Sequence, residues 1–542
     1  MLTTIAVHQG SMTKPGLCSR CKGLEAEDRP VACTVLEGGP CFACEERKVI
    51  RDQIEQLEEE IFRLKAKHHA LGTKMNAIHD PFIHKLPPEI GSHIFRLYFP
   101  TLDYEELDLW ARRREWVGGL RLGTVCSRWR QLAWITPDLW DILYLRIQPS
   151  TELSLAESLP GLLHEWLSRS GMRPLTIFFC HSGCSDPSND LSNESTVKTL
   201  EFTTDLIIEA INLHSGRWRN LHLHVGANIP ERLCGSIQPN QLLCLEVRIN
   251  GERSPTHKFI MKSKPFPTHL KLTNFSPTSI DIGWDNITRA NLSISASEWL
   301  EVLKRAPALE YCLAELRDDA MVDLGTTILH RRLRSLNSSY SGTRLLDAIN
   351  VPSLEEWTQN CILGPLQVTA MASLLKRSRC CLKILNLQQL SALPGDLSIL
   401  LEAIPSLEQL RFHFWAVLGP DGAMDDLFAR IFNSPLSNST LPSEEATCES
   451  FLPRLQFMEC TSSFKVFIPF SWDRIPRLYR QGHRRSLTLK STAKESQISD
   501  ETALQLLKLT DEGVDLQILD KTTRMGGDFL ENFRKRMGME GR

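Results

Sequence analysis

From residue 142 onward the chain repeats one local order, and this order constrains its fold more than any other feature. A helical segment comes first, then a turn with Pro or Gly, then a short strand that begins near a leucine. Strands are predicted to begin at Leu221, Leu243, Leu270, Leu309, Leu333, Leu354, Leu382 and Leu407. These starts lie mostly 21 to 28 residues apart, and the one gap of 39 residues contains a weak strand at 292–294. A recurring spacing of this size predicts stacked units of one strand and one helix.

Two α/β architectures share this alternation of strands and helices. A doubly wound sheet is covered on both faces, so its strands are near-continuous runs of Val and Ile. Repeats of about 20 to 29 residues with one strand and one helix each are typical of leucine-rich repeats. The strands here alternate leucine with polar residues, as a sheet with one face in solvent requires. We therefore expect residues 142–521 to form a solenoid of leucine-rich repeats, degenerate because the strict motif's Asn or Cys position is mostly absent.

Several polar segments interrupt or follow these repeats. Ser182–Thr196 is rich in Ser, Asn and Asp, Ser434–Ser450 looks like a second loop, and Gln481–Ser499 mixes basic and hydroxyl residues. Segments of such composition cannot bury much apolar surface, so we expect all three to protrude or to be disordered. Residues 522–542 are basic and contain glycine, and we expect a tail or a helical cap there.

Length and charge exclude some classes of protein. A chain of 542 residues is too long for one ordinary core. Its net charge of −3 argues against nucleic-acid binding driven by phosphate neutralisation. No apolar stretch approaches the length of a membrane span, and the amino end lacks the pattern of a secretory signal. We therefore expect the cytoplasm or the nucleus, with the 16 cysteines reduced.

Residues 47–80 predict a coiled-coil helix, since no proline interrupts them and Pro81 ends the run. Apolar side chains follow alternating steps of three and four residues, with His68 as the one polar member. The apolar members are Ile50, Ile54, Leu57, Ile61, Leu64, Leu71, Met75 and Ile78. Glu60 and Lys65 flank this seam, where opposite charges pair across two parallel helices. A homodimer through residues 47–79 and a single helix folded back on the next segment both remain open.

Residues 81–141 predict a compact set of short helices. Pro88 suits a first helical turn and Glu89 faces the positive end of the helix dipole. One apolar stripe follows at Ile90, Ile94, Leu97 and Tyr98, and a second at Leu122, Val125, Cys126, Trp129, Leu132 and Ala133. Thr136 and Pro137 begin one more turn, which ends at Trp140. Because a core of this size gives only marginal stability by itself, we expect this region to pack against neighbouring parts of the chain or against a partner.

These residues carry a family resemblance. Leu86-Pro87-Pro88-Glu89-Ile90, then Val125–Arg130 and Leu139-Trp140, resemble an F-box, in particular that of fungal F-box proteins with a preceding coiled coil and following leucine-rich repeats. The resemblance is specific over residues 83–141 and diffuse elsewhere. The chain departs from the pattern in an insert at 100–119, where Trp110 and Trp116 flank three arginines. A solvated face or a contact with an acidic partner would each explain that insert.

In that family the box binds a Skp-type adaptor, which links it to a cullin ubiquitin ligase. The resemblance implies adaptor contacts at Leu86, Pro87, Pro88, Glu89, Ile90, Ile94, Val125, Cys126 and Trp129. It also implies that this chain is a non-catalytic substrate receptor, requiring no cofactor, whose solenoid holds an unknown target protein near the ubiquitin-charged enzyme. The alternative is an interaction scaffold, oligomerised by the coiled coil and unconnected to ubiquitin.

The cysteines of residues 1–46 suggest one metal site. Cys18, Cys21, Cys41 and Cys44 form two Cys-x2-Cys pairs separated by 19 residues, within the spacing of a structural zinc ribbon. A disordered tail with incidental cysteines is the other interpretation, and a zinc-dependent nucleic-acid binder would rest on these pairs alone. No nucleophile elbow, phosphate loop or dinucleotide-binding motif occurs, so we expect no catalysis. His222 and His224 are expected to be solvated or hydrogen-bonded and not to be metal ligands.

Overall fold

The computed structural model combines a long amino-terminal helix with a large parallel sheet, so the chain is an α/β protein. It divides into one compact unit of residues 1–178 and 184–210 and a second of residues 179–183 and 211–542. The structure describes residues 42–78, 86–98, 118–148, 151–181, 194–226, 228–250, 258–317, 327–339, 344–362, 365–390, 397–415, 423–433, 451–462, 471–480, 486–493, 497–520 and 527–538.

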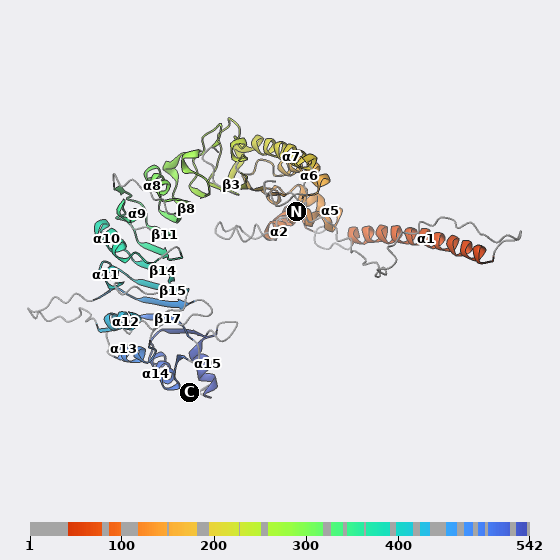
Figure 1. Ribbon diagram of the computed structural model, residues 1–542. Coiled ribbons are helices and arrows are strands. Elements are labelled where there is room, and N and C mark those ends of the chain that lie inside the picture. Colours follow the sequence, from red (N-terminus) through yellow and green to blue (C-terminus); the bar gives the residue numbers. More distant parts are fainter. Residues whose placement is uncertain are drawn as a thin grey trace, which may run out of the picture. The chain divides into compact units, whose positions relative to one another are not determined.

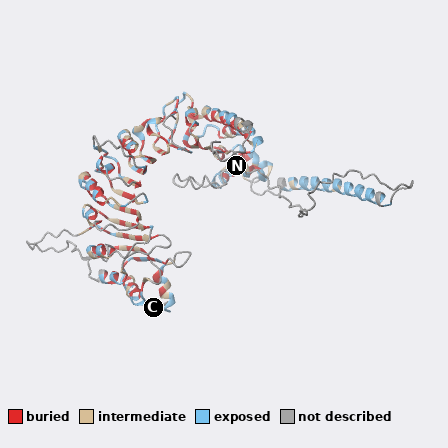
Figure 2. Ribbon diagram, viewed as in Figure 1, coloured by how far each residue is buried: buried red, intermediate tan, exposed pale blue. Residues whose placement is uncertain are grey.

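The first helix, α1 (Phe42–Ile78), begins before the predicted start at Arg47. The boundary at residues 46 and 47 was therefore wrong, and Cys44 belongs to the first turn of the helix. Glu45 in that turn favours this earlier start, because an acidic side chain stabilises the positive end of the helix dipole. Figure 2 colours α1 as exposed along most of its length. Among its described side chains none is buried.

Residues 86–98 and 118–139 of the first unit contain four short helices: α2 (Pro88–Leu97), α4 (Gly118–Val125), α5 (Ser127–Trp134) and the 3₁₀ helix η2 (Pro137–Leu139). We call them the helical module. Pro88 occupies the first turn of α2, as predicted. The second predicted stripe lies on two helices, because the extended backbone of Cys126 separates α4 from α5. The Cys126 sulfur also accepts the Trp129 backbone N–H at 3.4 Å and so caps α5.

The chain then enters the sheet with β1 (Ile142–Ile147), α6 (Leu153–Arg169), β2 (Leu175–His181) and α7 (Glu194–Leu213). α6 followed by β2 has the helix–turn–strand order predicted from residue 142 onward. The sequence did not predict β1, although alternate side chains of that strand are buried.

In the second unit the sheet runs in the order of the chain through β3, β4, β6, β8, β9, β11, β13, β14, β15, β16, β17 and β18, and the neighbouring strands are parallel. Their bounds are Trp218–Val225, Cys244–Ile249, His269–Thr273, Arg289–Ser295, Tyr311–Arg317, Ser335–Ser339, Glu356–Asn360, Ile384–Leu390, Gln409–Phe414, Phe457–Ser462, Thr488–Ala493 and Leu516–Asp520. Two minor pairs join β5 (Phe259–Ile260) to β7 (Ile280–Asp281) and β10 (Ile328–Leu329) to β12 (Ile349–Asn350).

The helices of this unit are α8 (Ala296–Arg305), α9 (Arg344–Asp347), α10 (Val368–Ser378), α11 (Leu397–Glu402), α12 (Ala423–Asn433), α13 (Arg474–Arg480), α14 (Asp500–Asp511) and α15 (Phe529–Arg536). Short 3₁₀ turns are η3 (Ser215–Arg217), η4 (Pro230–Arg232), η5 (Pro277–Ser279) and η6 (Trp284–Asn286). Figure 1 shows α8, α10 and α11 along one side of the strands. A capping box starts α8, with Ser295 and Glu298 each bonding the other's backbone N–H. Among the described helices, none is long and apolar enough to span a membrane.

Two rows of side chains run across the strands of the sheet, one on each face. One row faces the core and is buried at every strand: Leu221, Leu245, Leu270, Ala290, Cys312, Leu336, Trp357, Leu385, Leu410, Met458, Leu489 and Leu516. The residues that follow these twelve point to the opposite face and are polar or charged except Leu313. The predicted strand at 292–294 is confirmed as β8, which fills the gap of 39 residues.

One prediction for this region was wrong. The stretch Gln481–Ser499 does not protrude throughout, because β17 pairs with β16 and β18. Of the two alternatives for residues 522–542, a tail or a helical cap, a helix is present, because α15 buries Phe529, Leu530 and Phe533. The strand start predicted at Leu243 lies one residue before β4. Most of Ser182–Thr196 and all of Ser434–Ser450 lie outside the described residues.

Candidate functional site

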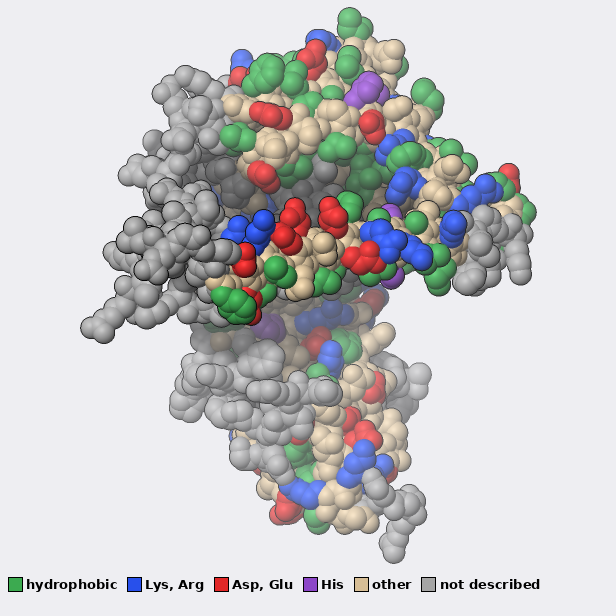
Figure 3. All heavy atoms as spheres, turned by 90° about the vertical axis from the view of Figure 1, so that its right-hand side faces the viewer, with side chains coloured by type: hydrophobic (Ala, Val, Ile, Leu, Met, Phe, Trp, Pro, Cys, Tyr) green, Lys and Arg blue, Asp and Glu red, His purple; other side chains and the backbone are tan. Residues whose placement is uncertain are grey.

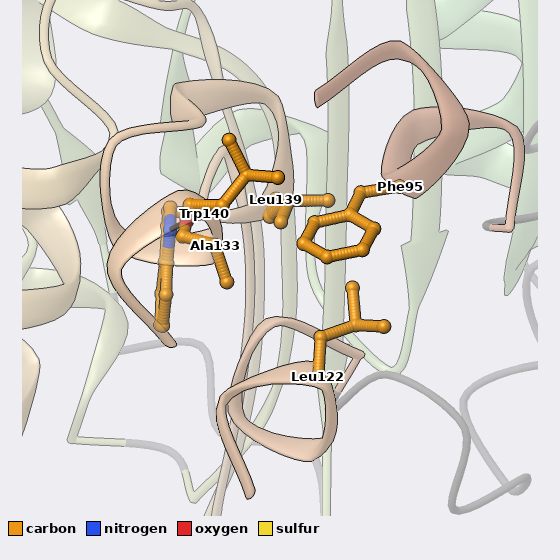
Figure 4. Close-up of a cluster of buried hydrophobic side chains, with 6 residues drawn as sticks. Phe95, Leu122, Ala133, Leu139 and Trp140 are labelled. Carbon is orange, nitrogen blue, oxygen red and sulfur yellow. Dashed lines mark hydrogen bonds between the residues drawn. The ribbon is translucent and has the colours of Figure 1, made fainter. Parts of the chain in front are cut away.

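The helical module has a closed apolar core. Phe95 from α2 meets Leu122 from α4, Leu132 and Ala133 from α5, and Leu139 and Trp140 from the last turn (Figure 4). The Trp140 indole donates to the Ala133 carbonyl at 2.8 Å, so its polar atom is paired inside this core. Burying these side chains holds three separate stretches of sequence together.

The first predicted stripe lies on the neighbouring, exposed face of α2. Ile90, Ile94 and Leu97 are 47%, 45% and 72% exposed, whereas Gly91 and Phe95 are buried. The helix approaches α5 closely at Gly91, since a Cβ built there would lie 2.5 Å from Leu132 Cδ2. The stripe is therefore a surface ridge and contributes little to the module's own core.

A hollow lies beside this ridge. Its volume is about 110 Å³, and it is lined by Leu86, Pro87, Pro88, Gly91, Arg128, Gln131, Leu132 and Ile135. Apolar side chains dominate the lining, and the exposed Ile135 extends it along the surface. An apolar ridge next to an apolar hollow is a surface that a second polypeptide can cover.

The predicted adaptor contacts fall into three groups. Leu86, Pro87 and Pro88 line the hollow, and Glu89, Ile90, Ile94 and Val125 are exposed. Cys126 caps α5 and is partly buried. Trp129 packs on Phe95 with ring centroids 5.0 Å apart and is partly buried against the module core. Of the insert at 100–119, all but the last two residues lie outside the described part.

The module is tied to α6 within the same unit. Trp166 packs edge-on against Trp140 at 4.8 Å, and the Arg169 guanidinium lies 4.4 Å from the Trp134 ring. Arg173 contacts Asp138 at 2.6 Å and Asp141 at 3.0 Å. Burial raises the pKa of Asp141, although the hydrogen bond and the charge of Arg173 oppose this. These contacts fix the module to the helix that follows it.

The polar face of the sheet carries a second notable cluster, centred on Glu246 of β4. His222 and His224 of β3 place Nδ1 and Nε2 at 2.8 and 2.9 Å from its carboxylate oxygens. Lys271 of β6 places Nζ at 3.0 Å. Because Glu246 is 5% exposed, its charge depends on these neighbours and not on water.

The pKa values of this cluster follow from its geometry. Burial lowers the pKa of His224, but hydrogen bonds to Cys180 and Glu246 and their charges outweigh it and raise the pKa to about 9. Burial raises the pKa of Glu246, but hydrogen bonds to the two histidines and the charges of His222 and Lys271 bring it well below its usual range. The carboxylate and the His224 imidazolium therefore form an ion pair at neutral pH.

A similar arrangement recurs near the other end of the sheet. Glu459 of β16 lies 3.8 Å from Arg411 of β15 and 2.8 Å from Lys490 of β17. In both places a carboxylate has basic side chains on the strands to either side, at the same register position. The polar face of the sheet therefore carries two clusters in which a carboxylate is paired with basic side chains.

Sequence reasoning named His222 and His224 but missed Glu246, Lys271 and the whole second cluster. Both histidines are hydrogen-bonded, which was one of the two alternatives expected for them. A usable signal was present: His222, Glu246 and Lys271 each follow the core leucine of their strand. Alignment of the strands on that leucine would have brought the three together.

The expected zinc site lies almost entirely outside the described residues. Cys18, Cys21 and Cys41 lie outside the described residues, and Cys44 is described only as part of α1. Within the described ranges, no three His, Cys, Asp or Glu side chains are placed to hold a metal ion. Burial raises the pKa of Cys244 and of Cys312 to about 12, so these two thiols remain protonated at neutral pH.

No protein-family model matches the sequence, and no curated protein matches it either. Function must therefore be inferred from two surfaces of the molecule. One is the ridge and hollow of the helical module, and the other is the polar face of the sheet.

Proposed function

We propose that the chain is the substrate-receptor subunit of a cullin-type ubiquitin ligase and binds a Skp-type adaptor through its helical module. The observation that carries this proposal is the exposed ridge of Ile90, Ile94 and Leu97 beside an apolar hollow, on a module whose own core is closed. The F-box resemblance of the same residues supplies the kind of partner.

The energetics favour a partner of this kind. Full burial of an Ile or Leu side chain contributes roughly 1.5 to 3 kcal/mol, so covering the remaining exposed half of each contributes about 1 kcal/mol. The ridge residues together with Val125 and Ile135 would supply the apolar centre of an interface, and Glu89 and Arg128 at the edge would supply polar contacts.

The sheet region would hold the target protein. We propose that it is a degenerate leucine-rich-repeat solenoid, supported by the parallel strands in chain order and by the buried leucine-type row. Its polar face, with the charged clusters at Glu246 and Glu459, would then contact the target. The mechanism is proximity, since the receptor raises the local concentration of target near the ubiquitin-charged enzyme and contributes no catalytic group.

Co-purification tests the proposal. The full chain carrying an affinity tag is co-expressed with a Skp-type adaptor and a cullin, and the eluted complex is measured for stoichiometry. We expect one adaptor per chain. The double variant Ile90→Asp/Ile94→Asp should lose the adaptor, because it places two charges in the apolar centre of the interface.

A matched control separates this effect from general surface change. Met172→Asp introduces one such charge at a residue of the same unit that is 87% exposed and does not belong to the ridge, and this variant should keep the adaptor. Failure of the intact chain to retain any adaptor would overturn the proposal and leave the interaction scaffold as the remaining function.

A further inference from the structure

The apolar seam of α1 is an exposed apolar feature of the described chain that the proposed function does not use. Ile50, Ile54, Leu57, Ile61, Leu64, Leu71 and Met75 are each 50% to 62% exposed. At 1.5 Å rise per residue, the row from Ile50 to Met75 is about 37 Å long. The described residues provide no cover for it. Figure 3 shows hydrophobic side chains lying among acidic and basic ones at the molecular surface.

We propose that α1 pairs with α1 of a second copy of this chain in a parallel, in-register coiled coil. This goes beyond the proposed function and does not depend on it. The seam alternates two positions, conventionally a and d, which interlock across two helices. The a positions are Ile54, Ile61, His68 and Met75, and the d positions are Ile50, Leu57, Leu64 and Leu71. Ile at a with Leu at d is the combination that favours two parallel strands.

The charges beside the seam agree with this pairing. In a parallel dimer each g position lies next to the e position five residues later on the other helix. This places Glu46 beside Arg51 and Glu60 beside Lys65 of the second copy. The Glu60 carboxylate already forms an ion pair with Arg63 of its own helix at 2.6 Å. Lys65 of the second copy would add a second cation to the same carboxylate. The remaining e–g neighbours place no like charges together.

An antiparallel pair also matches charges, because it places Glu60 beside Lys67 of the second copy, so the seam residues and Glu46 must distinguish the two directions. It would set His68 against Leu57 of the other copy, burying an imidazole against an apolar side chain. It would also leave Glu46 without a partner on the second helix. In the parallel pair His68 meets its own copy, and a single polar residue at an a position is a device that fixes register and the number of strands at a cost in stability.

The mass of the full chain in solution tests whether the pair forms. At micromolar concentration, light scattering should give the mass of two chains. Ile61→Asp should give the mass of one chain, because the charge falls in the seam. Phe62→Asp is the matched control: Phe62 is the next residue, is 76% exposed and points away from the seam, so this variant should remain a dimer. A monomeric intact chain, or a dimer that survives Ile61→Asp, would overturn the proposal.

Cysteine cross-linking tests the direction of the two helices. Under mild oxidation, Leu57→Cys should form a covalent dimer, because a d position faces its own copy in a parallel pair. Glu59→Cys lies on the outer side of α1 and should give no more cross-link than the unaltered chain. Cross-linking only when Leu57→Cys chains are mixed with His68→Cys chains would show an antiparallel pair and contradict the assignment.

Discussion

Glu246 illustrates how a single buried charge is stabilised in this sheet. Three basic side chains reach its carboxylate from the strands on either side, and all lie within 3.0 Å. Removing one partner would leave a charge uncompensated in a nearly dry environment, which is costly. The cluster therefore links stability to the protonation of His224.

The first prediction concerns the pH dependence of this link. Since the pKa of His224 rises from 6.5 to about 9 on folding, its stabilising contribution is fully present below pH 6.5 and is lost as pH rises through 9. At pH 6 the free energy of unfolding of the unaltered chain should exceed that of the His224→Gln variant by about 1 to 2 kcal/mol. Urea unfolding at pH 6, 8 and 10 measures this difference, and a difference that grows toward pH 10 would contradict the assignment.

The second prediction compares adjacent residues of α2. Phe95 is 3% exposed and packs in the module core, whereas Ile94 is 45% exposed on the ridge. Phe95→Ala should lower the free energy of unfolding by about 3 to 5 kcal/mol. Ile94→Ala should change it by less than about 0.5 kcal/mol. Limited proteolysis of the first unit distinguishes the two, and equal sensitivity would show that α2 is oriented differently.

For single residues, the sequence showed which apolar and charged side chains matter, but it did not show which of them are buried or what they contact. The stripe Ile90–Ile94–Leu97 was recognised, but periodicity cannot say which of two neighbouring faces packs inward, and Phe95 took the core position. Glu246 was missed because its partners lie 22 to 25 residues away in the chain and become neighbours only through strand register.

Elements were predicted well where apolar periodicity was strong. The helix–turn–strand units ending in β3, β9, β13 and β15 are confirmed. The weak strand β8 is confirmed too. Predictions failed where a polar segment forms a strand because its neighbours in the sheet hold it in place. β17 has the polar sequence Thr-Leu-Lys-Ser-Thr-Ala, yet it lies between two strands that supply its backbone hydrogen bonds.

The third prediction tests β17 as an element. Leu489 is 2% exposed in the core row, and Lys490 points to the polar face and contacts Glu459. Leu489→Ala should lower the free energy of unfolding by about 2 to 4 kcal/mol, and Lys490→Ala by at most about 1 kcal/mol. Urea unfolding of the two variants measures both effects. A negligible effect of Leu489→Ala would show that the segment is a protruding loop.

Besides the seam of α1, the described part of the molecule offers two surfaces of different chemistry. The helical module presents an apolar ridge and hollow, suited to a permanent or tight partner, while the sheet presents a polar face with two charged clusters. The sequence predicted an α/β chain and the run of strands, because leucine spacing reports the period of the units. The sequence could not predict the register between the strands or the identity of the target protein, because both depend on contacts between distant residues.

Hydrogen exchange of the full chain with and without a Skp-type adaptor tests the central claim, that the ridge and hollow form a docking surface. Adaptor binding should slow amide exchange in residues 86–98 and 125–136 and leave the strands of the second unit unchanged, because only the helical module becomes covered. Unchanged exchange in those two segments, or protection confined to the sheet, would contradict the account.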